Sequence, residues 1–99
     1  MVSHASAAVL HGLPTWSTAI DRVHLTRDRS GGGRRRPVVH VHGAPLRAED
    51  LAMLDGIAVT SLVRTVLDLA RTLPMDQAVA AGDRALAVGL SPLDLDRRL

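Results

Sequence analysis

Residues 51–73 read LAMLDGIAVTSLVRTVLDLARTL, and this stretch decides the fold class. The Asp-Gly pair at 55–56 is a typical two-residue turn between short apolar segments at 51–54 and 57–60, so the sequence predicts a tight β-hairpin. Two interpretations stay open for the first arm of this hairpin, because residues 47–54 also fit a helical turn.

A helix is expected directly after the hairpin, at residues 61–73. At 100° per residue, one continuous arc carries the apolar side chains, which are Leu62, Val63, Val66, Leu67, Leu69, Ala70 and Leu73. Thr60 or Ser61 should cap this helix, and the following proline should end it. The opposite arc is polar and predicts an exposed helix face, on which Arg64 and Asp68 form an ion pair one turn apart.

Three further helices are expected. A helix from residue 76 to 88 should form an antiparallel hairpin with the first helix, and Gly82 and several alanines should allow their close approach. Ser91-Pro92-Leu93-Asp94 has the pattern of a capped helix start. Ser3 should cap a short N-terminal helix that runs through His11. Because the two terminal helices are too short to be stable alone, we expect the chain to be a fragment of a longer architecture.

Two segments alternate apolar and polar side chains as half-buried strands do, residues 22–27 and 38–42. The stretch between them, residues 28–36, contains three consecutive glycines and predicts a mobile loop that closes a second hairpin. The expected fold is therefore α+β, with a small antiparallel sheet of two hairpins packed against a helical hairpin and a short N-terminal helix. We expect one domain, residues 1–99.

The composition narrows the chemistry. The 99 residues include no Cys, so disulfides, thiolate metal sites and thiol nucleophiles are excluded. The apolar fraction of 46% comes mainly from Leu, Ala and Val, with Trp16 as the single aromatic residue, so the core should be small in volume. The sequence shows neither a secretory signal nor an apolar run near the roughly 20 residues that span a bilayer. We expect a cytoplasmic protein without membrane contact.

Common enzyme motifs are missing from the sequence. It contains no Gly-x-Ser-x-Gly elbow, no phosphate-binding Gly-Lys-Ser/Thr loop and no His-Glu-x-x-His helix. Asp94 and Asp96 form a lone acidic pair, and no Lys is present to complete a nuclease site. The sequence therefore predicts no catalytic residue, no cofactor and no enzyme activity.

Three histidines, His24, His40 and His42, could share the polar face of the second predicted hairpin. Alternate histidines on a strand can converge on Zn²⁺, but no acidic fourth ligand lies nearby in the sequence. We favour the other interpretation, in which they face solvent as neutral imidazoles hydrogen-bonded across the strands, and we predict no metal.

The densest basic patch surrounds the glycine-rich loop. All 12 basic residues of the chain are Arg, and ten acidic residues reduce the net charge to +2, so local clusters matter more than the total. Guanidinium groups on a loop suit phosphate contact, and the candidate nucleic-acid-binding residues are Arg27, Arg29, Arg34, Arg35 and Arg36. With one aromatic residue, base stacking is excluded and only backbone contacts are expected. A solvated loop in an arginine-rich chain is the alternative.

Several motifs in order resemble the AbiEi-type antitoxins, the transcriptional-repressor halves of type IV toxin–antitoxin systems, and relatives that join this domain to a restriction-like endonuclease domain. The motifs are Ser3-His4-Ala5-Ser6-Ala7-Ala8, Leu10-His11-Gly12-Leu13-Pro14, Val23-His24-Leu25-Thr26, Val39-His40-Val41-His42, Asp55-Gly56-Ile57-Ala58-Val59-Thr60-Ser61, Arg64-Thr65 and Leu67-Asp68-Leu69-Ala70. They cover nearly the whole chain.

The resemblance implies a regulatory domain that opposes a nucleotidyltransferase-like toxin, by repression and by antagonism of its activity. Such proteins usually begin with a winged helix, and the chain starts after the place where it would lie, so any DNA contact would be to the backbone. The expected working surfaces are residues 34–36 and the exposed face of helix 61–73. Two alternatives stay open, the linker domain of an endonuclease and a protein–protein interaction module.

Overall fold

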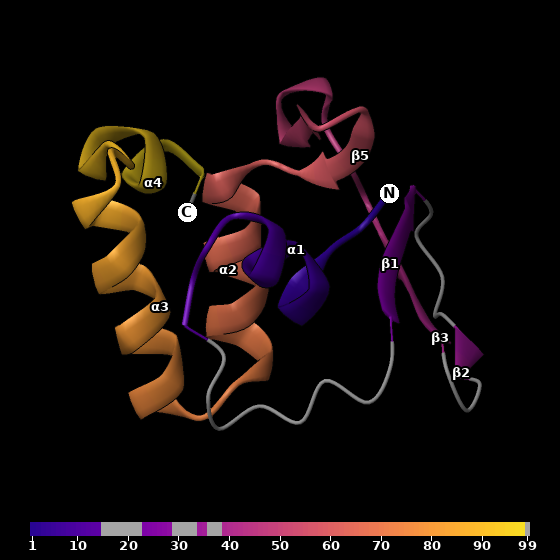
Figure 1. Cartoon of the computed structure of the whole chain (residues 1–99), viewed down its shortest axis with the longest axis horizontal. Coiled ribbons are helices and arrows are strands. Elements are labelled where there is room, and N and C mark those ends of the chain that lie inside the picture. The colour runs from indigo at the N-terminus through magenta and orange to yellow at the C-terminus, as the bar shows by residue number, and fades with distance from the viewer. Residues whose placement is uncertain (15–22, 29–33, 36–38, 99) are drawn as a thin grey trace.

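The computed structural model describes residues 1–14, 23–28, 34–35 and 39–98 (Figure 1). In chain order the elements are α1 (His4–Leu10), β1 (Val23–Asp28), β2 (Arg34–Arg35), β3 (Val39–Ala44), the 3₁₀ turn η1 (Ala48–Asp50), β4 (Leu51–Leu54), β5 (Ile57–Thr60), α2 (Leu62–Thr72), α3 (Met75–Ala87) and α4 (Pro92–Arg98). The predicted α+β class is confirmed. None of the helices described is long and apolar enough to cross a membrane.

The hairpin around Asp55 and Gly56 is confirmed. β4 and β5 pair antiparallel, with Leu54 opposite Ile57 at the turn. Both turn residues have positive φ angles, 51° and 78°, as a type I′ turn requires. Each interpretation of the first arm is right for part of it, because η1 precedes the strand β4 directly.

The other predicted hairpin is wrong. β1 and β3 run parallel, with His24 beside His40 and Thr26 beside His42, and β2 pairs antiparallel with β3. A simple hairpin would make β1 and β3 antiparallel. The short strand β2 lies between them in the sequence and runs opposite to β3, so the chain reverses twice and β1 and β3 are parallel. The sheet order is β1-β3-β2, so the arginine strand β2 forms its edge within the described part of the chain.

The first three residues join the two sheets. Val2 bridges to Leu25 of β1 in antiparallel sense and to Val59 of β5 in parallel sense. Its N–H donates to the Ala58 carbonyl at 2.9 Å, and its own carbonyl accepts from the Thr60 N–H at 2.8 Å. The described strands thus form one continuous layer in the order β2, β3, β1, residues 1–3, β5 and β4.

The polar face of this sheet layer is turned inward, toward the helices. Figure 1 shows α1 lying between the strands and α2. Thr26 is buried and donates from Oγ1 to Ser3 Oγ at 2.6 Å, whereas Val23 on the other face of β1 is 47% exposed. The three strand histidines are half-buried on this inner face, which corrects the expectation that they face solvent, and the expected hydrogen bond across the strands is present between His24 and His42. Buried hydroxyl groups are tolerated here because they are hydrogen-bonded to one another.

The apolar core lies among the helices and is small, as expected. Its buried members are Ala8, Leu13, Val66, Leu69, Ala81, Ala85 and Leu90. The predicted hairpin of α2 and α3 is present, and buried Ala81 and Ala85 bring α3 close to its neighbours. Gly82 does not contribute to this approach, because a Cβ at that position would meet no atom within 4 Å.

Candidate functional site

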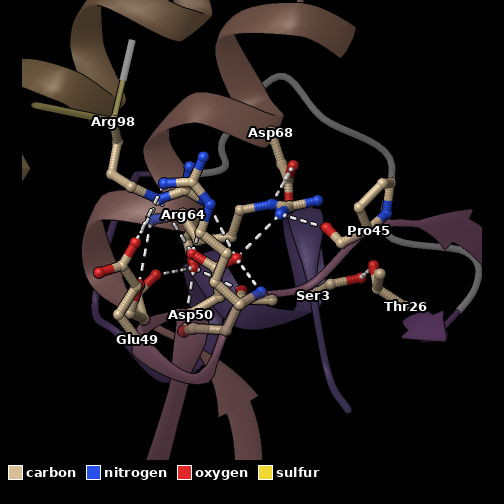
Figure 2. Close-up of polar contacts among 12 residues, drawn as sticks. Ser3, Thr26, Pro45, Glu49, Asp50, Arg64, Asp68 and Arg98 are labelled. Carbon is tan, nitrogen blue, oxygen red and sulfur yellow. Dashed lines mark hydrogen bonds and ion pairs between the residues drawn. The ribbon is translucent and has the colours of Figure 1, made fainter. Parts of the chain in front are cut away.

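A buried cluster of charges joins three separate parts of the chain (Figure 2). The Asp50 side chain, at the end of η1, is only 1% exposed. Arg98 of α4 donates from Nη2 to both of its oxygens, at 2.7 and 2.8 Å, and Arg64 of α2 donates from Nη1 at 3.1 Å. Arg98 Nε also donates to Asp50 Oδ1 at 3.2 Å, and the Arg47 N–H adds a fifth bond at 2.8 Å. We call Asp50, Arg64, Asp68 and Arg98 the ion network.

Arg64 contributes the central guanidinium of the ion network. Its Nε donates to Asp68 Oδ1 at 2.9 Å, which confirms the predicted ion pair, and its Nη1 also donates to the Pro45 carbonyl at 2.9 Å. The predicted exposure of this helix face is wrong, because Arg64 is 5% and Asp68 4% exposed. The segment from Pro45 to Asp50 lies against this face and supplies acceptors that replace water.

The pKa values of the two carboxyl groups in the ion network are shifted in opposite directions. Burial favours a higher pKa for Asp50, but the hydrogen bonds from the Arg47 N–H and from Arg98 outweigh it, so the pKa lies below its ordinary value. Burial raises the pKa of Asp68 despite the neighbouring Arg64. Asp68 Oδ2 has no hydrogen-bond partner among the described residues. Through Arg64 and Arg98, which both bind Asp50, the ion network holds α2 and α4 against η1.

The second polar cluster is a group of imidazole rings beneath α1. His24 on β1 lies beside His40 on β3, and His42 is two residues further along β3 on the same face. His24 Nδ1 and His42 Nε2 are 3.0 Å apart and share a hydrogen bond. The rings of His40 and His42 stack with centroids 3.9 Å apart. The structure therefore brings together the three histidines that the sequence offered as metal ligands.

His4 of α1 completes this group, which we call the histidine cluster. Its ring stacks on His42 with centroids 3.7 Å apart, and its Nδ1 is 2.9 Å from Ser3 Oγ. Burial, and secondarily the neighbouring His24, Arg64 and His40, lower the pKa of His4 to about 4. The ring is therefore neutral near pH 7. Its backbone adopts a positive φ of 51°, which non-glycine residues seldom do.

A hollow of about 370 Å³ opens beside the histidine cluster. Its walls comprise the four imidazoles together with Ala5, Leu69, Thr72 and Leu73. The strands fix the backbone of the three strand histidines. Because these residues are only half-buried, a small molecule or ion in the hollow can reach their rings. Such an arrangement can accept a small ligand or an ion.

The candidate arginines divide between described and undescribed positions. Arg27 is exposed on β1, and Arg34 and Arg35 constitute β2, where they pair with Val41 and His40 of β3. Arg29 and Arg36 lie outside the described residues. One strand separates β1 from β2, which sets Arg27 roughly 10 Å from the edge strand across the sheet.

Sequence reasoning missed three residues of these clusters, His4, Asp50 and Arg98. Asp50 and Arg98 are 48 positions apart, so no local spacing links them. His4 was assigned only to a short helix, and its proximity to β3 depends on the placement of residues 1–3 within the sheet. The helical spacing of Arg64 and Asp68 was the one local signal of the ion network.

Comparisons with protein-family models, with curated proteins and with solved structures gave no match to this chain. The resemblance to the AbiEi-type antitoxins therefore stays a prediction.

Proposed function

We propose that this chain is a non-catalytic regulatory domain of the AbiEi-antitoxin type, which acts in the cytoplasm beside a nucleotidyltransferase-like toxin. We further propose that it contacts the phosphate backbone of DNA through Arg27, Arg34 and Arg35. The observation that carries this proposal is the position of two consecutive arginines on the edge strand β2, in the same sheet as exposed Arg27. Duplex DNA presents one charge per roughly 1.7 Å of its axis. The distance of roughly 10 Å between Arg27 and β2 therefore corresponds to several phosphates.

The distribution of the remaining arginines supports this assignment. Arg64 and Arg98 are bound to buried carboxylates in the ion network, so their charges are compensated within the fold. Arg71, Arg84 and Arg97 are exposed but lie on three different helices, and exposed Arg47 pairs with Glu49. Arg27 and the two arginines of β2 are thus the densest group of basic residues along the described strands.

A salt-dependent DNA titration tests the proposal. We expect weak binding of the chain to a fluorescently labelled duplex at about 50 mM salt, with a loss of several-fold to 100-fold at about 200 mM. Replacing Arg34, Arg35 and the adjacent Arg36 by Ala should reduce the slope of log K against log salt by about 2 to 3, because each phosphate contact contributes close to one.

The matched control replaces the three exposed helical arginines, Arg71, Arg84 and Arg97, by Ala. This variant has the same net charge as the strand variant and should retain most of the binding. Equal loss in both variants would show a nonspecific charge effect and would overturn the assignment of the surface. Tight, sequence-specific binding at physiological salt would also contradict the proposal, because it requires a base-reading element.

A further inference from the structure

We propose that His24, His40 and His42 form a zinc-binding site with a fourth coordination position open to the adjacent hollow. One ligand nitrogen from each of the three residues lies within 4.8 Å of the other two. The site uses none of the arginines proposed to contact DNA, although Arg35 of β2 pairs with His40, and it stands independently of the proposed function.

The distances are close to those of a coordinated ion. At the usual Zn–N length of 2.0–2.1 Å, two ligands of a tetrahedral ion lie roughly 3.4 Å apart. His24 Nδ1 and His42 Nε2 are already 3.0 Å apart, and the longest separation in the set is bounded by 4.8 Å. Small rotations of the rings therefore suffice to enclose a zinc ion, which would replace the hydrogen bond between His24 and His42.

The backbone holds the three ligands in place. The parallel register sets His24 beside His40, and the two-residue repeat of β3 brings His42 to the same face. Ser3 Oγ lies 2.9 Å from His4 Nδ1 and holds the His4 ring. The His4 ring in turn stacks on the ring of His42, so α1 helps to position this ligand. Ligands fixed on strands and supported by neighbouring side chains lose little freedom when a metal binds.

The ligand set also indicates the kind of site. Neutral imidazole nitrogens suit zinc, and three histidines with an open fourth position are typical of sites that hold a water or an exogenous ligand. Leu69 and Leu73 line the hollow beside the rings. Because these three ligands leave the double charge of the ion uncompensated, we expect the fourth position to take water, hydroxide or a small anion.

Calorimetry with zinc chloride and untagged, metal-free chain tests the proposal. We expect one zinc ion per chain, and loss of one direct ligand in His40→Asn should weaken binding by at least the roughly 10- to 100-fold that changes around a metal ligand cost. Cobalt(II) should give the intense visible bands of a tetrahedral ion in the wild-type chain and lose them in this variant.

Histidine ring NMR of the wild-type chain tests the proposal even if a variant fails to fold. Zinc should shift the ring signals of His24, His40 and His42 and leave those of His11 nearly unchanged, because His11 bonds instead to the Thr60 carbonyl at 2.8 Å. His11→Asn is the matched control and should bind zinc as the wild type does. An absence of zinc-induced shifts, or equal weakening in His40→Asn and His11→Asn, would overturn the proposal.

Discussion

The Asp50 side chain links three separate elements of the fold. It accepts hydrogen bonds from the loop before η1, from α2 and from α4, while remaining almost entirely buried. A buried charge of this kind adds little net stability compared with an apolar replacement, but removing one partner leaves the others uncompensated. The ion network therefore makes the placement of α4 depend on a residue 48 positions away.

Replacing Asp50 tests this dependence at the residue scale. Asp50→Asn should lower the free energy of unfolding by about 3–5 kcal/mol, because it removes the buried carboxylate that Arg64 and Arg98 share and leaves Arg64 with Asp68 alone. Urea denaturation followed by circular dichroism measures the change. The neighbouring Glu49→Gln is the control and should change stability by less than about 1 kcal/mol, since Glu49 is 60% exposed and its ion pair with Arg98, at 3.6 Å, is open to solvent. A similar small effect for both variants would refute the account of the ion network.

At the scale of single elements, the sequence correctly predicted those features that depend on residues close together in the chain. The turn at Asp55 and Gly56 and the N-cap of α2, where Ser61 Oγ accepts from the Arg64 N–H at 3.2 Å, depend on residues within a few positions of each other. The pairing of β1 with β3 does not. Alternation along both strands identified two faces, but it could neither give the strand direction nor reveal that the histidine face is the inner one.

Two glycine substitutions separate these element-scale effects. Gly56→Ala should destabilise the protein by about 1 kcal/mol or more, because Gly56 has a φ of 78° that a side chain strains. Gly82→Ala should instead stabilise it by up to about 1 kcal/mol, since Gly82 lies inside α3 and a Cβ meets no atom within 4 Å. The midpoints of urea unfolding measure both. Changes of the same sign would contradict the described backbone.

At the scale of the whole molecule, the chain buries polar side chains between its sheet and its helices and keeps its apolar core among the helices. Ser3, Thr26 and Thr60 are all fully or almost fully buried on the sheet side, whereas Leu69 and Ala85 belong to the helical core. The candidate zinc ligands could be named from the sequence because of their spacing. Their convergence with His4 could not, since it depends on residues 1–3 joining the sheet between β1 and β5.

Stability should depend on pH through His4. Its folded pKa of about 4 lies below the ordinary 6.5, so the unfolded chain binds the proton first as the pH falls. Stability should therefore decrease between pH 6.5 and 4, by about 3 kcal/mol for this group. His4→Asn removes the titrating ring, and Asn also tolerates a positive φ. The stability advantage of the wild type over this variant should shrink across that pH range, in metal-free protein held with a chelator.

NMR titration of the His4 ring in the metal-free chain most directly tests the claim that the polar face of the sheet packs inward against α1. We predict that His4 titrates near pH 4, two units or more below an exposed imidazole. Titration of His4 near its ordinary value of 6.5 would place its ring in solvent and contradict the arrangement of α1, the sheet and the histidine cluster.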